Sequence, residues 1–211
     1  MRYLVMMAMT TVHLLPGTFA QAVEEYHNGS YIQALNGFYA LAKKGDPKAQ
    51  YNLGLMYANG EGVQKNIQKA KQWYEKAAMH GHGAAQYNLG KLHHIDAKKD
   101  PSRYVKAKEW YEKSSEAGVP QAFNNLATLY MNGEGVAKNE QKAFELFLEG
   151  ANKGDDASAF NVALLYGWGE QITHDKMKAY TYLKRALKGG KSEASEYLDK
   201  LCKESAWACH E

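Results

Sequence analysis

The sequence predicts an all-α protein, a solenoid in which pairs of helices are stacked one after another. One asparagine recurs at intervals of 36, 37 and 36 residues, at Asn52, Asn88, Asn125 and Asn161. An internal repeat of this length is typical of arrays that stack a single supersecondary unit. Within one unit, Ala49, Leu53 and Tyr57 are four residues apart, which is the spacing of one face of a helix.

The first 22 residues have the pattern of a secretory signal peptide. A short basic start with Arg2 is followed by the mostly apolar stretch from Leu4 to Leu15, which at about 12 residues is shorter than the ~20 that span a bilayer. Ala20-Gln21-Ala22 predicts cleavage before Val23, and Thr18-Phe19-Ala20 is a second site two residues earlier. We choose the first site and expect a periplasmic or secreted protein that is not embedded in the membrane.

Residues 23–47 are predicted to form a degenerate helix pair that caps the array. Tyr31-Ile32-Gln33-Ala34-Leu35 places Ala34 in register with a second repeated residue, at Ala70, Ala107, Ala143 and Ala179. Asn28-Gly29 is typical of a turn and is expected to join the two helices of the cap. Asn28-Gly29-Ser30 is also a glycosylation sequon, which has a meaning only in a eukaryotic secretory pathway.

Four repeats follow, over residues 48–83, 84–120, 121–156 and 157–192. Glycines at Gly60, Gly62, Gly133 and Gly135 are expected to end the first helix of a unit through a positive φ. Asn66, Asn139 and Asp175 stand where they can cap the second helix. The turn between units carries Gly45, Gly81, Gly118, Gly154 or Gly190. Each unit is therefore predicted to be a helix, a glycine loop, a capped helix and a glycine turn.

The pattern A-x-x-x-L-G-x-x-Y-x-x-G-x-G-V, followed by K-A-x-x-W-Y-x-K-A-A, is intact in residues 49–78. This pattern resembles the SEL-1-like repeat, a relative of the tetratricopeptide repeat, and the resemblance covers residues 24–200. It implies a right-handed α/α superhelix, and many bacterial members are exported proteins that bind other proteins. The chain departs from the pattern in the second unit, where the residues from His93 to Pro101 replace the glycine loop, and in the fourth, at Gly167–Ile172.

Residues 193–211 are predicted to form a C-terminal cap that contains both cysteines, Cys202 and Cys209. In an oxidising compartment we expect the two to form a disulfide. Seven positions along a straight helix cover ~10.5 Å, beyond the ~7 Å that a disulfide bridges between Cα atoms. The chain must therefore turn back, with Trp207 tucked beneath the bridge. The spacing of the two cysteines differs from the C-x-x-C of redox-active pairs.

Composition argues against nucleic acid as a partner. The formal net charge is +3, and nearly all the positive charge is on lysine, since the only arginines are Arg2, Arg103 and Arg185. Lysine lacks the planar fork that arginine uses to bind phosphates and bases.

The sequence contains no recognisable catalytic or cofactor motif. Some disulfide-rich relatives have been linked to β-lactam hydrolysis, but the chain has no Ser-x-x-Lys and lacks their cysteine pairs in each repeat. His80, His82, His93 and His94 could converge on a metal. We prefer a packing position for His93, which aligns with Tyr57, Tyr130 and Tyr166, and expect neither a metal site nor a cofactor.

The remaining candidate is a surface. Side chains beside the buried stripe of each first helix line the concave groove in tetratricopeptide-like arrays. The predicted partner-binding residues are Tyr51, Asn52, Leu55, Tyr87, Asn88, Lys91, Asn124, Asn125, Thr128, Phe160 and Asn161. Repeated amide and aromatic groups suit an extended peptide or a partner helix. The alternative for the four repeated asparagines is a hydrogen bond to the neighbouring repeat.

We therefore expect a non-catalytic interaction module that binds a protein through this groove. Envelope regulators, host-interaction factors and immunity proteins that neutralise a toxin all fit the resemblance. The alternative is a hydrolase that acts on a β-lactam or a cell-wall-related substrate.

Overall fold

The computed structural model describes residues 17–205, and every regular element in this range is an α-helix, eleven in all. The predicted all-α class is confirmed. The chain divides into two compact units, Met1–Trp73 and Tyr74–Glu211. The first 16 residues of the predicted signal peptide, and Trp207 and Cys209 of the predicted cap, lie outside the described residues.

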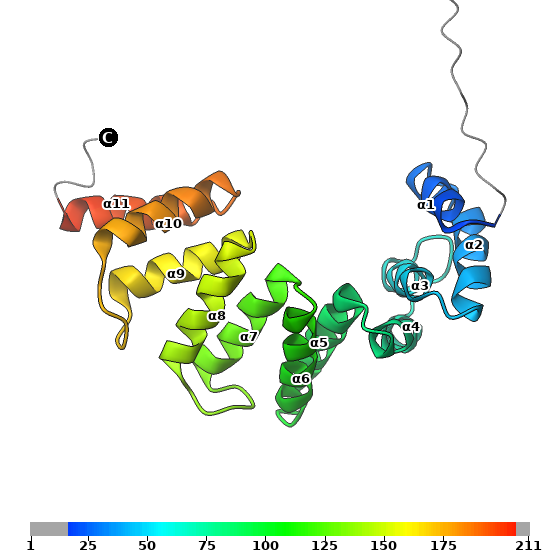
Figure 1. Cartoon of the computed structure of the whole chain (residues 1–211), viewed down its shortest axis with the longest axis horizontal. Coiled ribbons are helices and arrows are strands. Elements are labelled where there is room, and N and C mark those ends of the chain that lie inside the picture. Colours follow the sequence, from blue (N-terminus) through cyan, green and yellow to red (C-terminus); the bar gives the residue numbers. More distant parts are fainter. Residues whose placement is uncertain (1–16, 206–211) are drawn as a thin grey trace, which may run out of the picture. The chain divides into compact units, whose positions relative to one another are not determined.

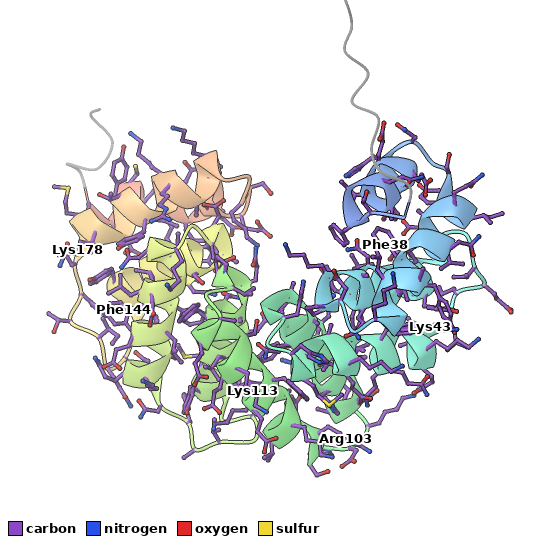
Figure 2. All side chains as sticks on the ribbon, turned by 45° about the vertical axis from the view of Figure 1, so that its right-hand side comes forward. Phe38, Lys43, Arg103, Lys113, Phe144 and Lys178 are labelled. Carbon is purple, nitrogen blue, oxygen red and sulfur yellow. The ribbon has the colours of Figure 1, made fainter. Side chains whose placement is uncertain are left out.

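The N-terminal unit contains α1 (Phe19–His27), α2 (Tyr31–Lys43) and α3 (Pro47–Asn59), and α4 (Ile67–Met79) begins in it (Figure 1). Gly29, with a φ of 77°, makes the predicted turn between α1 and α2. Phe38 is fully buried among these helices (Figure 2), where Ala22, Leu53 and Met56 belong to the same core. The residues of the predicted N-terminal cap thus form a packed helix pair.

The second unit continues as a series of helices that pack against their neighbours in chain order (Figure 1). Their bounds are α5 (Gly83–Ala97), α6 (Arg103–Glu116), α7 (Pro120–Asn132), α8 (Glu140–Asn152), α9 (Asp156–Trp168), α10 (Lys176–Lys188) and α11 (Ala194–Glu204). In addition α7 contacts α9, so that the first helices of successive repeats lie side by side.

The helix ends follow from the predicted residues. Gly60 and Gly133 end α3 and α7 in the left-handed conformation, with φ of 84° and 73°. The side chains of Asn139 and Asp175 accept hydrogen bonds from the backbone N–H groups of Lys142 (2.8 Å) and Lys178 (3.0 Å). Asn66 caps α4 in the same way. The predicted turn glycines all have positive φ, at Gly45, Gly81, Gly118, Gly154 and Gly190.

Small side chains set the spacing of the helices. The alanine that recurs in the second helix of each pair is completely buried at Ala34, Ala70, Ala107, Ala143 and Ala179. Gly90 also allows close packing of its helix, because an added Cβ would lie 2.5 Å from the ring of the buried Tyr111. Helices therefore approach more closely at these positions than larger side chains would allow.

The structure differs from the sequence pattern in the second repeat. Helix α5 continues to Ala97, so the first five of the nine residues that replace the glycine loop are helical. These residues contain no glycine that could end the helix in a left-handed turn. His93 is 5% exposed, which confirms the predicted packing position.

The two buried helical glycines Gly90 and Gly167 should respond oppositely to alanine. Gly90→Ala should lower the free energy of unfolding by about 1–2 kcal/mol, because the methyl group displaces Tyr111. Gly167→Ala should raise it by about 0.5–1 kcal/mol through helix propensity. At Gly167 the new Cβ makes an ordinary 3.7 Å contact with Ala179. Urea denaturation followed by circular dichroism measures both, and equal effects would contradict this account of the packing.

Candidate functional site

The predicted groove residues fall in both units of the chain. Tyr51, Asn52 and Leu55 are half-buried on α3, in the N-terminal unit. The side-chain amide of Asn52 donates to the backbone oxygen of Lys48 at 2.8 Å, within its own helix. The other predicted residues lie on α5, α7 and α9, so the second unit by itself builds the surface described below.

A series of amide hydrogen bonds runs across three helices of that unit. Asn161 on α9 donates to the side-chain oxygen of Asn124 on α7 at 2.9 Å. Asn124 in turn donates to Asn125 at 3.2 Å, and Asn125 approaches the hydroxyl of Tyr87 on α5 at 3.5 Å. Two of the repeated asparagines thus contact a neighbouring repeat, through its side chains. An amide has four hydrogen-bonding positions, so these groups keep donors and acceptors for a partner.

Tyr87 ends the amide series in a partly dry environment. Burial raises the pKa of its phenol, and the negative charge of Asp155 raises it further, while the hydrogen bond with Asn125 acts in the opposite direction. The ring packs against that of Tyr111, with centroids 6.2 Å apart. Lys91 is exposed and places its ammonium group 5.5 Å from the centroid of Tyr87. A neutral phenol and a mobile cation therefore stand at this edge of the surface.

The remaining predicted residues are half-buried around the same series. Thr128 on α7 donates its hydroxyl to the backbone oxygen of Asn124 at 2.9 Å. Phe160 on α9 packs edge-on against Tyr197 on α11, with centroids 5.4 Å apart. Asn88 lies half-buried on α5. The structure thus brings together the predicted residues of α7 and α9 and connects them to Tyr87.

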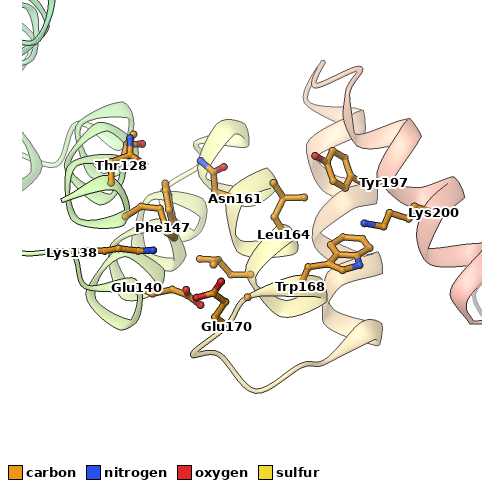
Figure 3. A pocket seen from close by; sticks show the side chains of 14 residues that line it. Thr128, Lys138, Glu140, Phe147, Asn161, Leu164, Trp168, Glu170, Tyr197 and Lys200 are labelled. Carbon is orange, nitrogen blue, oxygen red and sulfur yellow. The ribbon is translucent and has the colours of Figure 1, made fainter. Parts of the chain in front are cut away.

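A pocket of about 550 Å³ opens next to the amide series (Figure 3). Thr128 and Asn161, both predicted residues, belong to its wall. The others are Met131, Asn132, Lys138, Glu140, Phe147, Leu164, Leu165, Trp168, Gly169, Glu170, Tyr197 and Lys200. The pocket combines apolar and aromatic walls with polar and charged groups, and such a concave mixture is common in binding sites.

The pocket also contains Trp168, Tyr197 and Lys200, which the repeat pattern did not predict as binding residues. Trp168 stands at the end of α9, and its indole N–H donates to Glu204 at 3.3 Å. Its ring is 5.6 Å from that of Tyr197, and the ammonium group of Lys200 lies 4.6 Å from its centroid. The only sequence signal was indirect, since Gly167–Ile172 interrupts the repeat pattern where this part of the pocket forms.

Glu140 is a nearly buried carboxylate in the pocket wall, at 5% exposure. It occupies the first turn of α8, where the helix dipole favours a negative charge. Its Oε1 accepts a hydrogen bond from the backbone N–H of Gln171 at 2.8 Å. An added Cβ at Gly169 would lie 2.9 Å from the same oxygen, so the loop after α9 passes directly over the carboxylate. Glu140 thus holds this loop against the pocket.

The four histidines considered as metal ligands have separate surroundings. His80 contacts the backbone oxygen of Lys76, and His82 caps α5 by accepting from the N–H of Ala85. His94 lies 3.9 Å from the carboxylate of Glu134, and His93 is buried. Among residues 17–205, no three His, Cys, Asp or Glu side chains are grouped so that they could hold a metal ion.

Within the described part of the chain, no helix is both long enough and apolar enough to span a membrane. Cys202 is half-buried on α11, and its predicted partner Cys209 lies outside the described residues, so the disulfide stays a prediction.

Comparison with known proteins identifies the family. The Sel1 repeat model matches four consecutive segments, residues 47–82, 83–119, 120–155 and 156–191. The chain belongs to the Sel1 repeat family, as the resemblance in the sequence indicated. Its fold is typical of protein-interaction modules, and Sel1 repeat proteins are generally non-catalytic.

Solved structures support the helical solenoid. A Sel1 repeat protein from Oxalobacter formigenes is 27% identical, with a TM-score of 0.75 over 89% of this chain and 81% of that one. The immunity protein Pa5087 from Pseudomonas aeruginosa is 22% identical, with a TM-score of 0.56 over 88% of this chain and 72% of that one. This second likeness concerns the fold alone.

A longer relative is the sel1-like repeat-containing protein L21 of Acanthamoeba polyphaga mimivirus. It is 34% identical over 135 residues, which are 64% of this chain and 24% of that protein. The present chain therefore spans about a quarter of the length of this relative.

The hydrogen bond between Asn161 and Asn124 should appear as an energetic coupling between two repeats. Asn161→Ala and Asn124→Ala should be non-additive by about 1 kcal/mol in the free energy of unfolding, because each removes the same bond. Asn52→Ala combined with Asn161→Ala is the matched control and should be additive, since the amide of Asn52 bonds within α3. Urea denaturation of the three single and two double variants measures both couplings. A coupling near zero for the first pair would mean that the amide series does not connect the repeats.

Proposed function

We propose that this Sel1 repeat chain is an exported, non-catalytic module that binds a protein on the face built by α5, α7, α9 and α11. The observation that carries the proposal is the pocket beside the amide series, which combines an apolar anchor site and amide groups with further hydrogen-bonding positions on one surface. Protein interfaces have the same organisation, with a desolvated apolar centre inside a polar rim.

The packing of the pocket supports a binding role. Trp168 packs against Tyr197, and Tyr197 packs against Phe160, so these contacts restrict both rings before a partner arrives. Aromatic side chains that are already ordered lose little conformational entropy on binding, and they are the residues that most often dominate the energy of an interface. The pocket can therefore anchor one or a few side chains of a partner.

The amide series provides the polar part of the same surface. An extended peptide presents a backbone N–H or C=O at regular intervals, and an asparagine amide can bond to either group. Asn124 and Asn161 lie on successive repeats and contact one another, so a peptide that crosses α7 and α9 would meet two amides at one level. Lys91, at the edge of the surface on α5, would add a charge that selects among partners.

Export is part of the proposal and rests on the N-terminal sequence pattern. The structure bears on which of the two cleavage sites is used. Ala22 is 1% exposed and belongs to the N-terminal core, where a Cβ added to Gly37 on α2 would lie 2.9 Å from its methyl group. Cleavage after Ala22 would remove this contact, whereas cleavage after Ala20 would retain it. We therefore favour the second site over the one chosen from the sequence.

Three roles are compatible with such a module: an envelope regulator, a host-interaction factor and an immunity protein that neutralises a toxin. The immunity protein Pa5087 shows that this fold serves an immunity protein in Pseudomonas aeruginosa. The present chain would use the surface of its second unit in any of the three roles. The identity of the captured partner separates them, because a toxin, an envelope protein and a host protein have different origins.

The binding surface can be tested by introducing a charge into the pocket. Leu164→Glu should reduce the partner protein captured from envelope extracts or from the secretions of neighbouring cells by about tenfold or more, because an unpaired carboxylate would be desolvated on binding. Met177→Glu is the matched control, since Met177 is 58% exposed on α10 and should leave capture unchanged. Quantitative mass spectrometry of the eluates measures both, after circular dichroism has shown intact folds. Equal capture by Leu164→Glu and the parent chain would reject the proposed surface.

The cleavage site can be read from the mass of the exported chain. Expression in a Gram-negative bacterium and fractionation of the periplasm should yield a protein that begins at Gln21, because this product keeps Ala22 in the core. Mass spectrometry of the intact protein distinguishes a start at Gln21 from one at Val23. A chain that stays in the cytoplasm with Met1 in place would contradict the proposed export.

A further inference from the structure

We propose that the pocket holds a basic side chain of the protein partner, best an arginine, whose charged group meets the carboxylate of Glu140. This inference rests on the proposed function and specifies which partner residue the anchor site selects. It follows from the distribution of charge and apolar surface around the pocket.

Glu140 is the group that decides the preference. The two oxygens of a carboxylate offer about four acceptor positions. Within residues 17–205, the Glu140 carboxylate accepts a single hydrogen bond, from the backbone N–H of Gln171. The same described range contains no salt bridge to Glu140. A carboxylate at 5% exposure in a pocket wall therefore keeps unused acceptor positions in a partly desolvated site.

Glu140 shares its end of the pocket with side chains of both charges (Figure 3). Glu170 lies at the same end in Figure 3 and adds a second, exposed carboxylate. Lys138 also lines the pocket, but it is exposed and forms no salt bridge with either glutamate in the described structure. An exposed lysine remains hydrated and can move aside, whereas the buried carboxylate cannot leave its place. Two glutamates and two lysines line the pocket, and Glu140 is the buried one among these four charged residues.

The walls between this end and Trp168 suit the hydrocarbon part of a basic side chain. Phe147, Leu164 and Leu165 provide an apolar path along which the methylene groups of arginine or lysine can lie. At the other end Lys200 already lies 4.6 Å from the centre of the Trp168 ring, so this indole stabilises a cation within the chain itself. The pocket therefore combines apolar walls with the carboxylate of Glu140, while its indole already interacts with a cation of the chain itself.

An apolar or aromatic occupant fits less well. It would cover the wall of the pocket but also remove the remaining water from Glu140 without replacing its hydrogen bonds, which is unfavourable for a carboxylate. A guanidinium group replaces that water with two parallel N–H donors in the geometry that a carboxylate accepts. Charge complementarity thus favours a basic residue over a neutral residue of similar size.

The test uses small probes and the purified chain. N-acetyl-arginine amide is titrated at millimolar concentration, and binding is followed by the NMR signal of the Trp168 indole N–H, assigned with Trp168→Phe. N-acetyl-citrulline amide is the matched neutral probe, because its ureido group has nearly the shape of guanidinium without the charge. N-acetyl-phenylalanine amide represents the aromatic alternative.

The arginine probe should shift the Trp168 indole signal until the shift saturates. It should bind at least about tenfold more tightly than the citrulline probe. Glu140→Gln should abolish most of this difference, while its amide oxygen can still accept from Gln171 and hold the loop. Glu145→Gln, on the exposed face of α8, is the control variant and should bind the arginine probe like the parent chain. Circular dichroism and urea denaturation establish that both variants are folded.

Stronger binding of the phenylalanine probe than of the arginine probe would overturn the inference, and so would equal binding of arginine and citrulline. Failure of all three probes would overturn it as well. The proposed function is tested separately by capture with Leu164→Glu. If that variant loses its partner while Glu140→Gln retains it, the surface binds a protein but Glu140 does not select a basic residue.

Discussion

Close approach between helices is the constraint on which the rest of this structure depends. At the repeated alanine of each pair the side chain is fully buried, and at Gly90 even a methyl group would collide with Tyr111. Larger side chains at these positions would push the helices apart and shift one repeat against the next. Because the spacing is small, Asn161 reaches Asn124 of the preceding repeat at 2.9 Å. The polar face on α7 and α9 therefore depends on the close packing that these small residues allow between the helices.

The fold could be predicted because the information for it is local. A glycine that needs a positive φ, or an asparagine four residues before a buried alanine, has the same role in each repeat that contains it. The prediction was weakest where this local chemistry is missing. Helices α3 and α7 end at a glycine, but no glycine stands at the equivalent position after His93. Helix α5 therefore continues to Ala97, because no residue there stops it. The spacing of the pattern predicted the repeat, whereas the length of α5 depends on the absence of a stop signal.

The candidate site was only partly visible in the sequence. Thr128 and Asn161 lie on successive first helices, where the repeat aligns them with Leu164 and Asn125, so the repeat predicted that they share a surface. Tyr197 and Lys200 come from α11, which lies beyond the last repeat matched by the family, and no periodic pattern points to them. Glu140 resembled an ordinary acidic residue at the start of a helix. Its burial results from the loop that follows α9, a tertiary contact over 31 residues of sequence.

The position of Glu140 links the order of this loop to the chemistry of the pocket. The first turn of α8 and the N–H of Gln171 stabilise the negative charge, and a hydrogen bond to a charged group contributes about 1.5–3 kcal/mol. The carboxylate thus bonds to the loop on one side and lines the pocket on the other. The same group therefore fixes Gly169 and Gln171 and presents its other acceptor positions to the pocket. A partner that neutralises the charge would act on a group that already holds the loop in place, so binding requires little rearrangement of the site.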